Sequence, residues 1–363
     1  MPRPRTVYRG KRKYSWIITL LVFVLVVLIL VAVWLFYYLQ RYIVYDKESL
    51  RLVLPAERAD TLPLPDAVSQ PVSVPKVDVE IVVDQTDYSG VSTDAGQELT
   101  PMRALFVSAE ELTEQNLAYY AGGIGDFNAI VLELKGPDGF LSYRSGIPLA
   151  ESYAVNGSLE LAEALEKLKA QDIRLVAQIS GLIDETMALR NGPIALKNAV
   201  TESVFQNSKG AWLDPYSDTA RAYLRDFLQE LHDLGFDEVL LSNLYCPNSE
   251  NLQFSKSMTL TPDPVSAVSS LALWLRGEAD AIGITLSAII EAETIAAGES
   301  ETVGQDPEVF FKAFDRVAFE TAKADSSVCI SALEEALGSG DPELRILPIT
   351  ENYAPERDSY LVK

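Results

Sequence analysis

Histidine and cysteine are almost absent from this chain of 363 residues, which has one histidine, His232, and two cysteines, Cys246 and Cys329. His232 occupies the polar side of a helical pattern, which predicts a surface side chain. No other histidine can act as a base, so the sequence argues against a Ser-His-Asp triad. The sequence has no cysteine–histidine cluster of the kind that holds zinc, and we expect no metal and no cofactor. Two cysteines make no disulfide framework, although a single disulfide stays open.

Positive charge is also scarce, with 30 Lys and Arg residues against 52 Asp and Glu residues and a net charge of −22. Six of the positive charges lie in the first 13 residues, so subtraction leaves about −28 for the rest of the chain. Like charges repel, so the sequence argues against nucleic acid as a partner.

Residues 16–39 contain no charged residue at all. About 20 apolar residues span a bilayer, so this stretch predicts one transmembrane helix with the lipid bilayer as its partner. Basic residues that precede a span stay in the cytoplasm. Here they are Arg3, Arg5, Arg9, Lys11, Arg12 and Lys13. The sequence thus predicts a single-pass cell-membrane protein with a cytoplasmic N-terminus and an extracytoplasmic C-terminal domain.

A cleaved signal peptide is the alternative for this stretch. Its apolar region would normally be about 7–15 residues long and would end at small residues. The run here is longer, and bulky residues follow Val31-Ala32-Val33. The pattern favours an uncleaved anchor.

Four segments follow from composition: a cytoplasmic basic tail at 1–15, the transmembrane helix at 16–39, an extracytoplasmic linker at 40–101 and a folded domain at 102–363. Prolines punctuate the linker and disfavour a long helix there. One alternating stretch, 77–83, predicts a short strand.

The folded domain alternates apolar strands with amphipathic helices. Expected strands are 103–108, 129–134, 173–180, 237–242, 284–290, 315–320, 345–350 and 358–362. Expected helices are 110–121, 158–171 with Ser158 as its N-cap, 217–234, 264–281, 307–313 and 327–337. This order predicts an α/β fold, a (β/α)8 TIM barrel. The runner-up, a doubly wound sheet, usually has a glycine-rich turn after its first strand, whereas Ser108-Ala109-Glu110-Glu111 follows here.

In such barrels the working face lies at the C-terminal ends of the strands. Carboxylates and amides without histidine suit carbohydrate, and glycoside hydrolysis needs two carboxyls facing one bond. Alternation would place Glu133 and Lys135 on one side of their strand. The strand-end positions are Ser108, Glu110, Glu133, Lys135, Gln178, Asp184, Ser242, Asn243, Tyr245, Glu291, Glu293, Glu320, Glu351 and Asn352.

Four segments together resemble a family of bacterial barrels described as putative glycoside hydrolases. Residues 128–143 resemble its N-A-V-V-I-D-V-K-D-x-x-G-x-V-x-Y run, and 176–184 resemble A-R-I-V-x-F-x-D. Residues 212–217 match W-x-D-P-Y-S, and 235–247 match G-F-D-E-I-Q-F-D-Y-I-R-F-P. The resemblance implies a TIM barrel that acts on or binds polysaccharide. Within the W-x-D-P-Y-S segment, Asp214 would cap the following helix and Pro215 would begin it.

The departures from the family pattern fall where chemistry would take place. The family's strand-four acid and arginine correspond to Ser242 and Tyr245, its strand-three arginine to Gln178, and its strand-five acid to Ile289. Serine and isoleucine cannot replace a catalytic carboxylate. The motifs thus leave enzymatic activity open.

Three functions compete. The first is a membrane-anchored hydrolase of envelope or external polysaccharide with Glu133 and Glu320 as its catalytic pair. The second is an inactive envelope protein that binds glycan or protein, and the third is a scaffold. Expected substrate-binding residues are Lys135, Gln178, Asp184, Ser242, Asn243, Tyr245, Glu291 and Glu351.

Overall fold

The computed structural model describes residues 23–25, 43–46, 49–52, 99–153, 155–255, 263–352 and 357–363. The chain divides into two compact units, Met1–Val83 and Asp84–Lys363. The predicted transmembrane helix lies outside the described residues except for Phe23–Leu25, which are helical. Among the described residues, no helix has both the length and the apolar character that a bilayer crossing requires. The predicted strand at 77–83 also lies outside the described residues.

The first unit contains an antiparallel pair of strands, β1 (Ile43–Asp46) and β2 (Ser49–Leu52), in which Ile43 pairs with Leu52. This pair falls in the stretch that the sequence predicts to be an extended linker. The two strands are joined by two residues, a spacing typical of tight hairpins.

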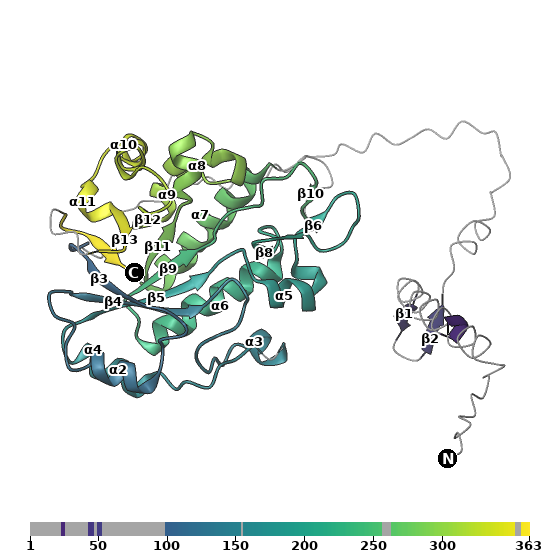
Figure 1. Cartoon of the computed structure of the whole chain (residues 1–363), viewed down its shortest axis with the longest axis horizontal. Helices are drawn as coiled ribbons and strands as arrows, with labels where there is room; N and C mark the ends of the chain where they lie inside the picture. Colours follow the sequence, from purple (N-terminus) through teal and green to yellow (C-terminus); the bar gives the residue numbers. More distant parts are fainter. Residues whose placement is uncertain are drawn as a thin grey trace, which may run out of the picture. The chain divides into compact units, whose positions relative to one another are not determined.

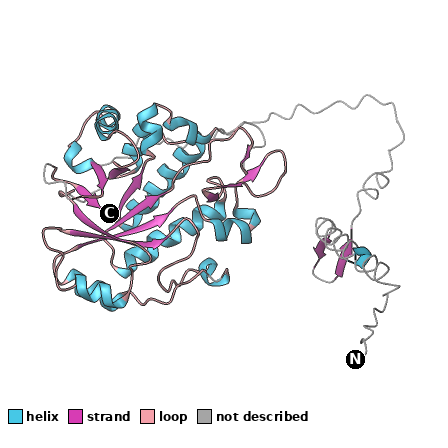
Figure 2. Cartoon of the chain, viewed as in Figure 1, coloured by secondary structure: helices cyan, strands magenta, loops and turns pink. Residues whose placement is uncertain are grey.

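The second unit is built on a closed barrel in which eight parallel strands pair in the order β11-β12-β13-β14-β3-β4-β5-β9 (Figures 1 and 2). Pairing of β14 with β3 closes the ring. The expected barrel is confirmed, and each strand lies inside or within one residue of its predicted range. The strands are β3 (Arg103–Val107), β4 (Ala129–Lys135), β5 (Arg174–Ser180), β9 (Glu238–Ser242), β11 (Thr285–Ile289), β12 (Arg316–Glu320), β13 (Ile346–Thr350) and β14 (Tyr360–Val362).

Helices between the strands surround the barrel, as Figure 2 shows. The six predicted helices are present as α2 (Glu114–Tyr120), α4 (Ala162–Lys169), α6 (Asp218–Leu234), α7 (Pro264–Ile282), α9 (Pro307–Ala313) and α10 (Ser326–Leu337). The sequence did not predict α3 (Pro148–Ser152), α5 (Glu185–Arg190), α8 (Ala292–Ala297), α11 (Pro342–Arg345) or the 3-10 turns at Gly192–Ile194 and Ser300–Val303. Each of these is at most six residues long, too short to show helical periodicity.

Two expected helix caps are wrong. Helix α4 begins at Ala162 with Leu161 as its N-cap, so Ser158 lies outside it. Helix α6 is capped by Ser217, whose side chain accepts from the N–H of Ala220. Asp214 instead accepts from the N–H groups of Tyr216 and Ser255, 2.9 and 2.6 Å away. Its carboxylate therefore joins two loops rather than starting a helix.

The strands separate two apolar cores, because successive side chains point to opposite faces. The larger core lies between the strands and the helices. The smaller core fills the inside of the barrel and includes Phe106, Val131, Val176, Leu240 and Ala318. The inner core identifies which residues further along each strand face the open end of the barrel.

Two small antiparallel pairs lie in the loops near the ends of β5 and β9. One joins β6 (Lys197–Asn198) to β10 (Leu252–Gln253), and the other joins β7 (Gln206–Asn207) to β8 (Gly210–Ala211). The β7–β8 turn brings Lys209 next to the site described below.

A buried ion cluster occupies the N-terminal end of the barrel. Glu238 contacts Arg316 at 2.6 Å and Arg174 at 3.1 Å, and the hydroxyl of Ser287 donates to it at 2.6 Å. Burial by itself would raise the pKa of Glu238, but the two arginines and Ser287 outweigh burial and lower it. Glu238 belongs to the segment that resembles the family, yet its position at the start of β9 gives it a structural role.

The same cluster reaches the segment before the barrel, because Arg316 donates to the carbonyl of Thr100 at 2.9 Å. A fragment beginning at the predicted boundary, residue 102, would lose this contact. A fragment spanning the compact unit Asp84–Lys363 keeps it. We therefore use residues 84–363 in the soluble-fragment experiments below.

Both cysteines are free and buried, and Cys246 is completely enclosed. Burial raises the pKa of the Cys246 thiol well above its ordinary value. His232 lies on the surface, as expected, with its side chain 42% exposed.

Candidate functional site

The C-terminal ends of the barrel strands form the candidate site, which we call the mouth. Val131, Val176, Leu240 and Ala318 belong to the inner core, and the residue two positions later on each strand faces the same way. Those residues are Glu133, Gln178, Ser242 and Glu320. Ile289, which packs against the inner core, occupies the corresponding place on β11.

Glu133 lies on the β4 side of the mouth and accepts a hydrogen bond of 3.1 Å from the N–H of Ala109. Its neighbour across the strand pair is Gln178, which is 6% exposed. The predicted catalytic partner, Glu320, is on β12. Three strands separate β4 from β12 in either direction around the closed ring, so the two glutamates belong to opposite sides of the mouth.

Glu320 is held by two lysines. Its carboxylate contacts Lys323 at 2.7 Å and Lys363 at 3.1 Å. Burial by itself would raise the pKa of Glu320, but hydrogen bonds and charge from the two lysines outweigh burial and lower it. Glu320 is therefore an ionised carboxylate at neutral pH, suited to stabilising positive charge and unsuited to donating a proton.

Glu291, after β11, is held by a lysine that sequence reasoning did not identify. Lys209, in the β7–β8 turn, lies 3.3 Å from Glu291 and donates to the hydroxyl of Tyr245 at 3.1 Å. Burial by itself would lower the pKa of Lys209, but these two contacts outweigh burial and raise it. The lysine is thus charged at neutral pH. No helical or strand periodicity could have predicted this contact, because the turn approaches the mouth only through tertiary folding.

Ser242 and Asn243 complete the β9 side of the mouth. The side-chain amide of Asn243 donates to the hydroxyl of Ser180 at 2.9 Å. Asn243 has a φ of +52°, a conformation that asparagine tolerates better than most residues. Tyr245 is 3% exposed. Its pKa is raised by burial and by Glu291, which outweigh the opposite effect of Lys209 and Lys323. Glu351, after β13, is exposed.

Lys135 and Asp184, both expected to bind substrate, do not line the mouth. A β-bulge between Glu133 and Lys135 shifts the register, so Lys135 pairs with Ile179, a residue of the outer core. The expectation that Glu133 and Lys135 share one side of the strand is therefore wrong. Lys135 contacts Asp184 at 2.9 Å, and both side chains are 0% exposed.

Asp184 also has a local structural role that leaves it little freedom. It caps α5 by accepting from the N–H of Met187. Gly139, with a φ of +84°, packs against its carboxylate, and a Cβ there would lie 2.1 Å from an Asp184 oxygen. Only glycine fits this approach, and the β4 loop is thereby fixed over the ion pair.

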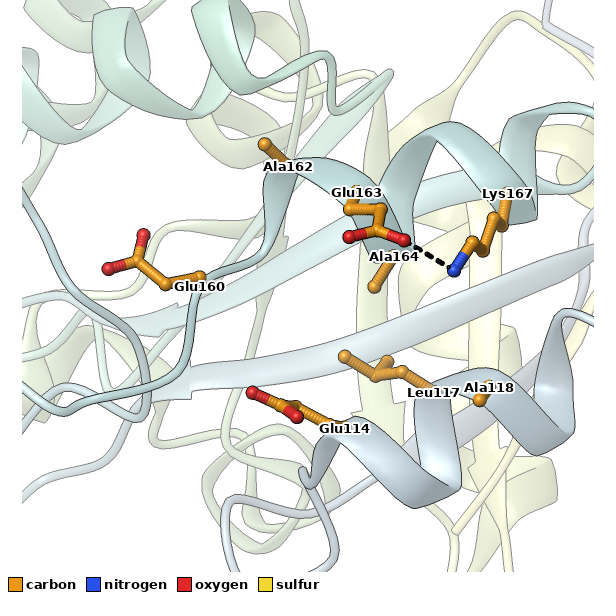
Figure 3. Close-up of a pocket in the computed structure, with 8 residues that line it drawn as sticks. All are labelled: Glu114, Leu117, Ala118, Glu160, Ala162, Glu163, Ala164 and Lys167. Atoms are coloured by element: carbon orange, nitrogen blue, oxygen red, sulfur yellow. Dashed lines mark hydrogen bonds and ion pairs between the residues drawn. The ribbon is translucent and has the colours of Figure 1, made fainter.

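Two cavities lie away from the mouth. One, of about 490 Å³, is a groove between α2 and α4 in which Leu117 and Ala164 lie between the helices and Glu163 pairs with Lys167 (Figure 3). The other, of about 560 Å³, lies at the N-terminal end of the barrel beside Arg174 and Asp237. Among the described residues, no group of three or more histidine, cysteine or carboxylate side chains could hold a metal ion.

The sequence profile of the family described as "Putative glycosyl hydrolase domain" matches residues 104–319, which extend from β3 into β12. No curated protein matches the chain significantly.

Three solved structures illustrate the similarity of the chain to known proteins. A hypothetical protein from Ruminiclostridium thermocellum ATCC 27405 is 21% identical, with 51% of this chain and 96% of that chain covered and a TM-score of 0.45. Ega3 from Aspergillus fumigatus, in complex with galactosamine, is 11% identical, with 70% and 78% covered and a TM-score of 0.41. A chitinase from Chromobacterium violaceum ATCC 12472 is 14% identical, with 68% and 67% covered and a TM-score of 0.41. These similarities concern the fold and assign no substrate.

Proposed function

The chain belongs to the putative glycosyl hydrolase domain family, and from that membership we propose a membrane-anchored, extracytoplasmic barrel that binds a cell-envelope or external polysaccharide at its mouth. The observation that carries binding rather than hydrolysis is the residue type at the ends of β9 and β11. Ser242 and Ile289 stand at the positions where the sequence pattern of the family has acids, and neither can transfer a proton. Hydrolysis needs a protonated carboxyl as general acid beside a second, ionised one. Lys323 and Lys363 hold the Glu320 carboxylate and lower its pKa, which suits it to the ionised role alone.

Other features of the mouth also support binding. The amide of Gln178 and the carboxamide of Asn243 can exchange hydrogen bonds with sugar hydroxyls. Tyr245 is buried in the outer core, and its hydroxyl accepts from Lys209.

Hydrolysis is the second candidate, favoured by the placement of Glu133 and Glu320 on opposite sides of one mouth. In this reading Glu133 would donate the proton and Glu320 would act as the ionised partner. The separation of the two carboxyls would then decide the stereochemistry, about 5–5.5 Å for retention and about 6.5–9.5 Å for inversion.

A glycan array probed with residues 84–363 separates the two candidates. We expect binding without release of reducing ends. Glu133→Gln should weaken that binding about tenfold, because hydrogen bonds to a charged group are stronger than those to a neutral amide. Its melting temperature should stay nearly unchanged, since the amide is almost isosteric.

Glu163→Gln, which alters an exposed glutamate on α4, is the matched control and should bind like the parent. Release of reducing ends that is lost in Glu133→Gln would instead favour hydrolysis. If Glu133→Gln melts several degrees lower and binds normally, Glu133 braces the barrel and does not touch the ligand.

The membrane anchor rests on the uncharged stretch 16–39 and the six basic residues before it. We expect protease added to intact cells to remove epitopes placed in residues 100–363 and to spare an epitope at the N-terminus. Complete protection of the barrel epitopes, with cleavage after the cells are permeabilised, would contradict this orientation.

A further inference from the structure

Three lysines from separate parts of the chain converge on one side of the mouth. Lys209 lies in the β7–β8 turn, Lys323 follows β12, and Lys363 follows β14. They alternate with two carboxylates, because Lys209 contacts Glu291 while Lys323 and Lys363 contact Glu320. Glu291 and Glu293 also act on Lys323 through their charge. We call Lys209, Glu291, Lys323, Glu320 and Lys363 the lysine arc.

The lysines of the arc keep N–H donors that could bind a ligand. Their side chains are 53%, 47% and 50% exposed for Lys209, Lys323 and Lys363, whereas Glu291 and Glu320 are only 16% and 21% exposed. An ammonium carries three N–H donors. The ammonium groups are therefore the more exposed part of the arc, and the two carboxylates are the more buried part.

The strands next to the arc are mixed in charge. Ser242 on β9 and Ile289 on β11 are uncharged, whereas the exposed Glu351 follows β13, the strand between β12 and β14. Glu133 lies on β4, on the side opposite Glu320. Residues 84–363 contain only nine lysines in a strongly acidic chain, and three of them meet here. A third of these lysines therefore lie on one side of the mouth.

We propose that the lysine arc recognises an acidic glycan, with the carboxylate or sulfate of a sugar unit received by Lys209 and Lys323. This inference rests on the proposed function and specifies its substrate class. Lysine is a point charge that pairs with either anion, so both belong to the same chemistry. The remaining sugar hydroxyls would then face Gln178 and Asn243 across the mouth.

The test measures binding of the full chain in detergent micelles to three probes of equal length. These are an oligogalacturonate, a sulfated galactan oligosaccharide and a neutral galactan oligosaccharide. We expect either acidic probe to bind at least about tenfold more tightly than the neutral probe, and Lys209→Gln or Lys323→Gln to remove most of that difference. Whichever acidic probe binds more tightly identifies the anion.

Lys167→Gln is the matched control, because Lys167 is 57% exposed and paired with a glutamate but lies on α4, away from the mouth. It should bind like the parent. A neutral probe that binds as tightly as the acidic ones, with no effect of the arc variants, would overturn the inference and leave the proposed function standing. Failure of all glycans on the array to bind would overturn both. If Lys167→Gln lost binding to the same extent, the weaker binding of the arc variants would reflect the overall charge of the protein. That result would also overturn the inference.

Discussion

Replacing Glu238 with glutamine is expected to lower the free energy of unfolding of residues 84–363 by about 3–5 kcal/mol, because the buried Arg316 and the partly buried Arg174 would lose their counter-ion. Arg316 is completely buried and Arg174 is 22% exposed, and both contact the Glu238 carboxylate. For a domain of this size the melting temperature should fall by roughly 10 °C. Thermal unfolding followed by circular dichroism measures the effect.

Glu163→Gln makes the same chemical change at an exposed helix position and should leave the melting temperature nearly unchanged. A Glu238→Gln variant that melts like this control would show that the cluster tolerates an uncompensated charge.

The same glutamate gives the parent fragment a defined dependence on pH. The pKa of Glu238 is lower in the folded state than in the unfolded chain. Its stabilising contribution is therefore fully present above the unfolded pKa and is lost as the pH falls through the folded pKa. We expect the parent to lose stability at acidic pH more steeply than Glu238→Gln, which has no carboxyl to protonate there.

The second large effect concerns the buried pair of Lys135 and Asp184. Lys135→Met should cost about 3–5 kcal/mol, since it leaves the Asp184 carboxylate buried without its cation. The double variant Lys135→Met with Asp184→Asn should recover much of the loss, because asparagine is neutral and still caps α5. Urea unfolding of the four proteins in the cycle measures the coupling between the two residues.

This cycle also tests whether the pair belongs to the ligand site. Both side chains are 0% exposed, so we expect the double variant, once folded, to bind glycan like the parent. Lys167→Met, at an exposed position, is the control for lysine loss. A double variant that is stable but no longer binds glycan would show that Lys135 and Asp184 contribute to the ligand site.

Most strands and helices of the barrel could be predicted because the pattern that identifies each one lies in residues close together in the sequence. Apolar runs such as Ala129–Lys135 and helical spacing such as that of Asp218–Leu234 fix each element from residues that are neighbours in sequence. The short helices α5 and α8 escaped prediction, since six residues hold less than two turns of a helical pattern. The N-cap of α6 was predicted wrongly because Asp214 and Ser217 are both residue types that favour this position. Asp214 instead accepts from the N–H groups of Tyr216 and Ser255, and the second of these lies far away in sequence.

The candidate site could be predicted only in part. Strand ends correctly located Glu133, Gln178, Ser242 and Glu320, because parallel strands in a barrel bring their C-terminal ends to one face. Lys135 was misplaced because a β-bulge cannot be seen in the alternation of a single strand, and one extra residue reverses every side chain that follows.

The sequence by itself determined the order of the strands and helices, the uncharged stretch near the N-terminus and the replacement of acids by Ser242 and Ile289. Each of these depends on residue type or on spacing along the chain. Only the tertiary structure decided that Glu238 joins Arg174 and Arg316, that Lys135 turns towards Asp184, and that Lys209 reaches Glu291. The members of each contact lie 49 to 82 residues apart. Such partners meet only after the barrel has closed. A buried charge is then stabilised by the opposite charge that the fold places beside it.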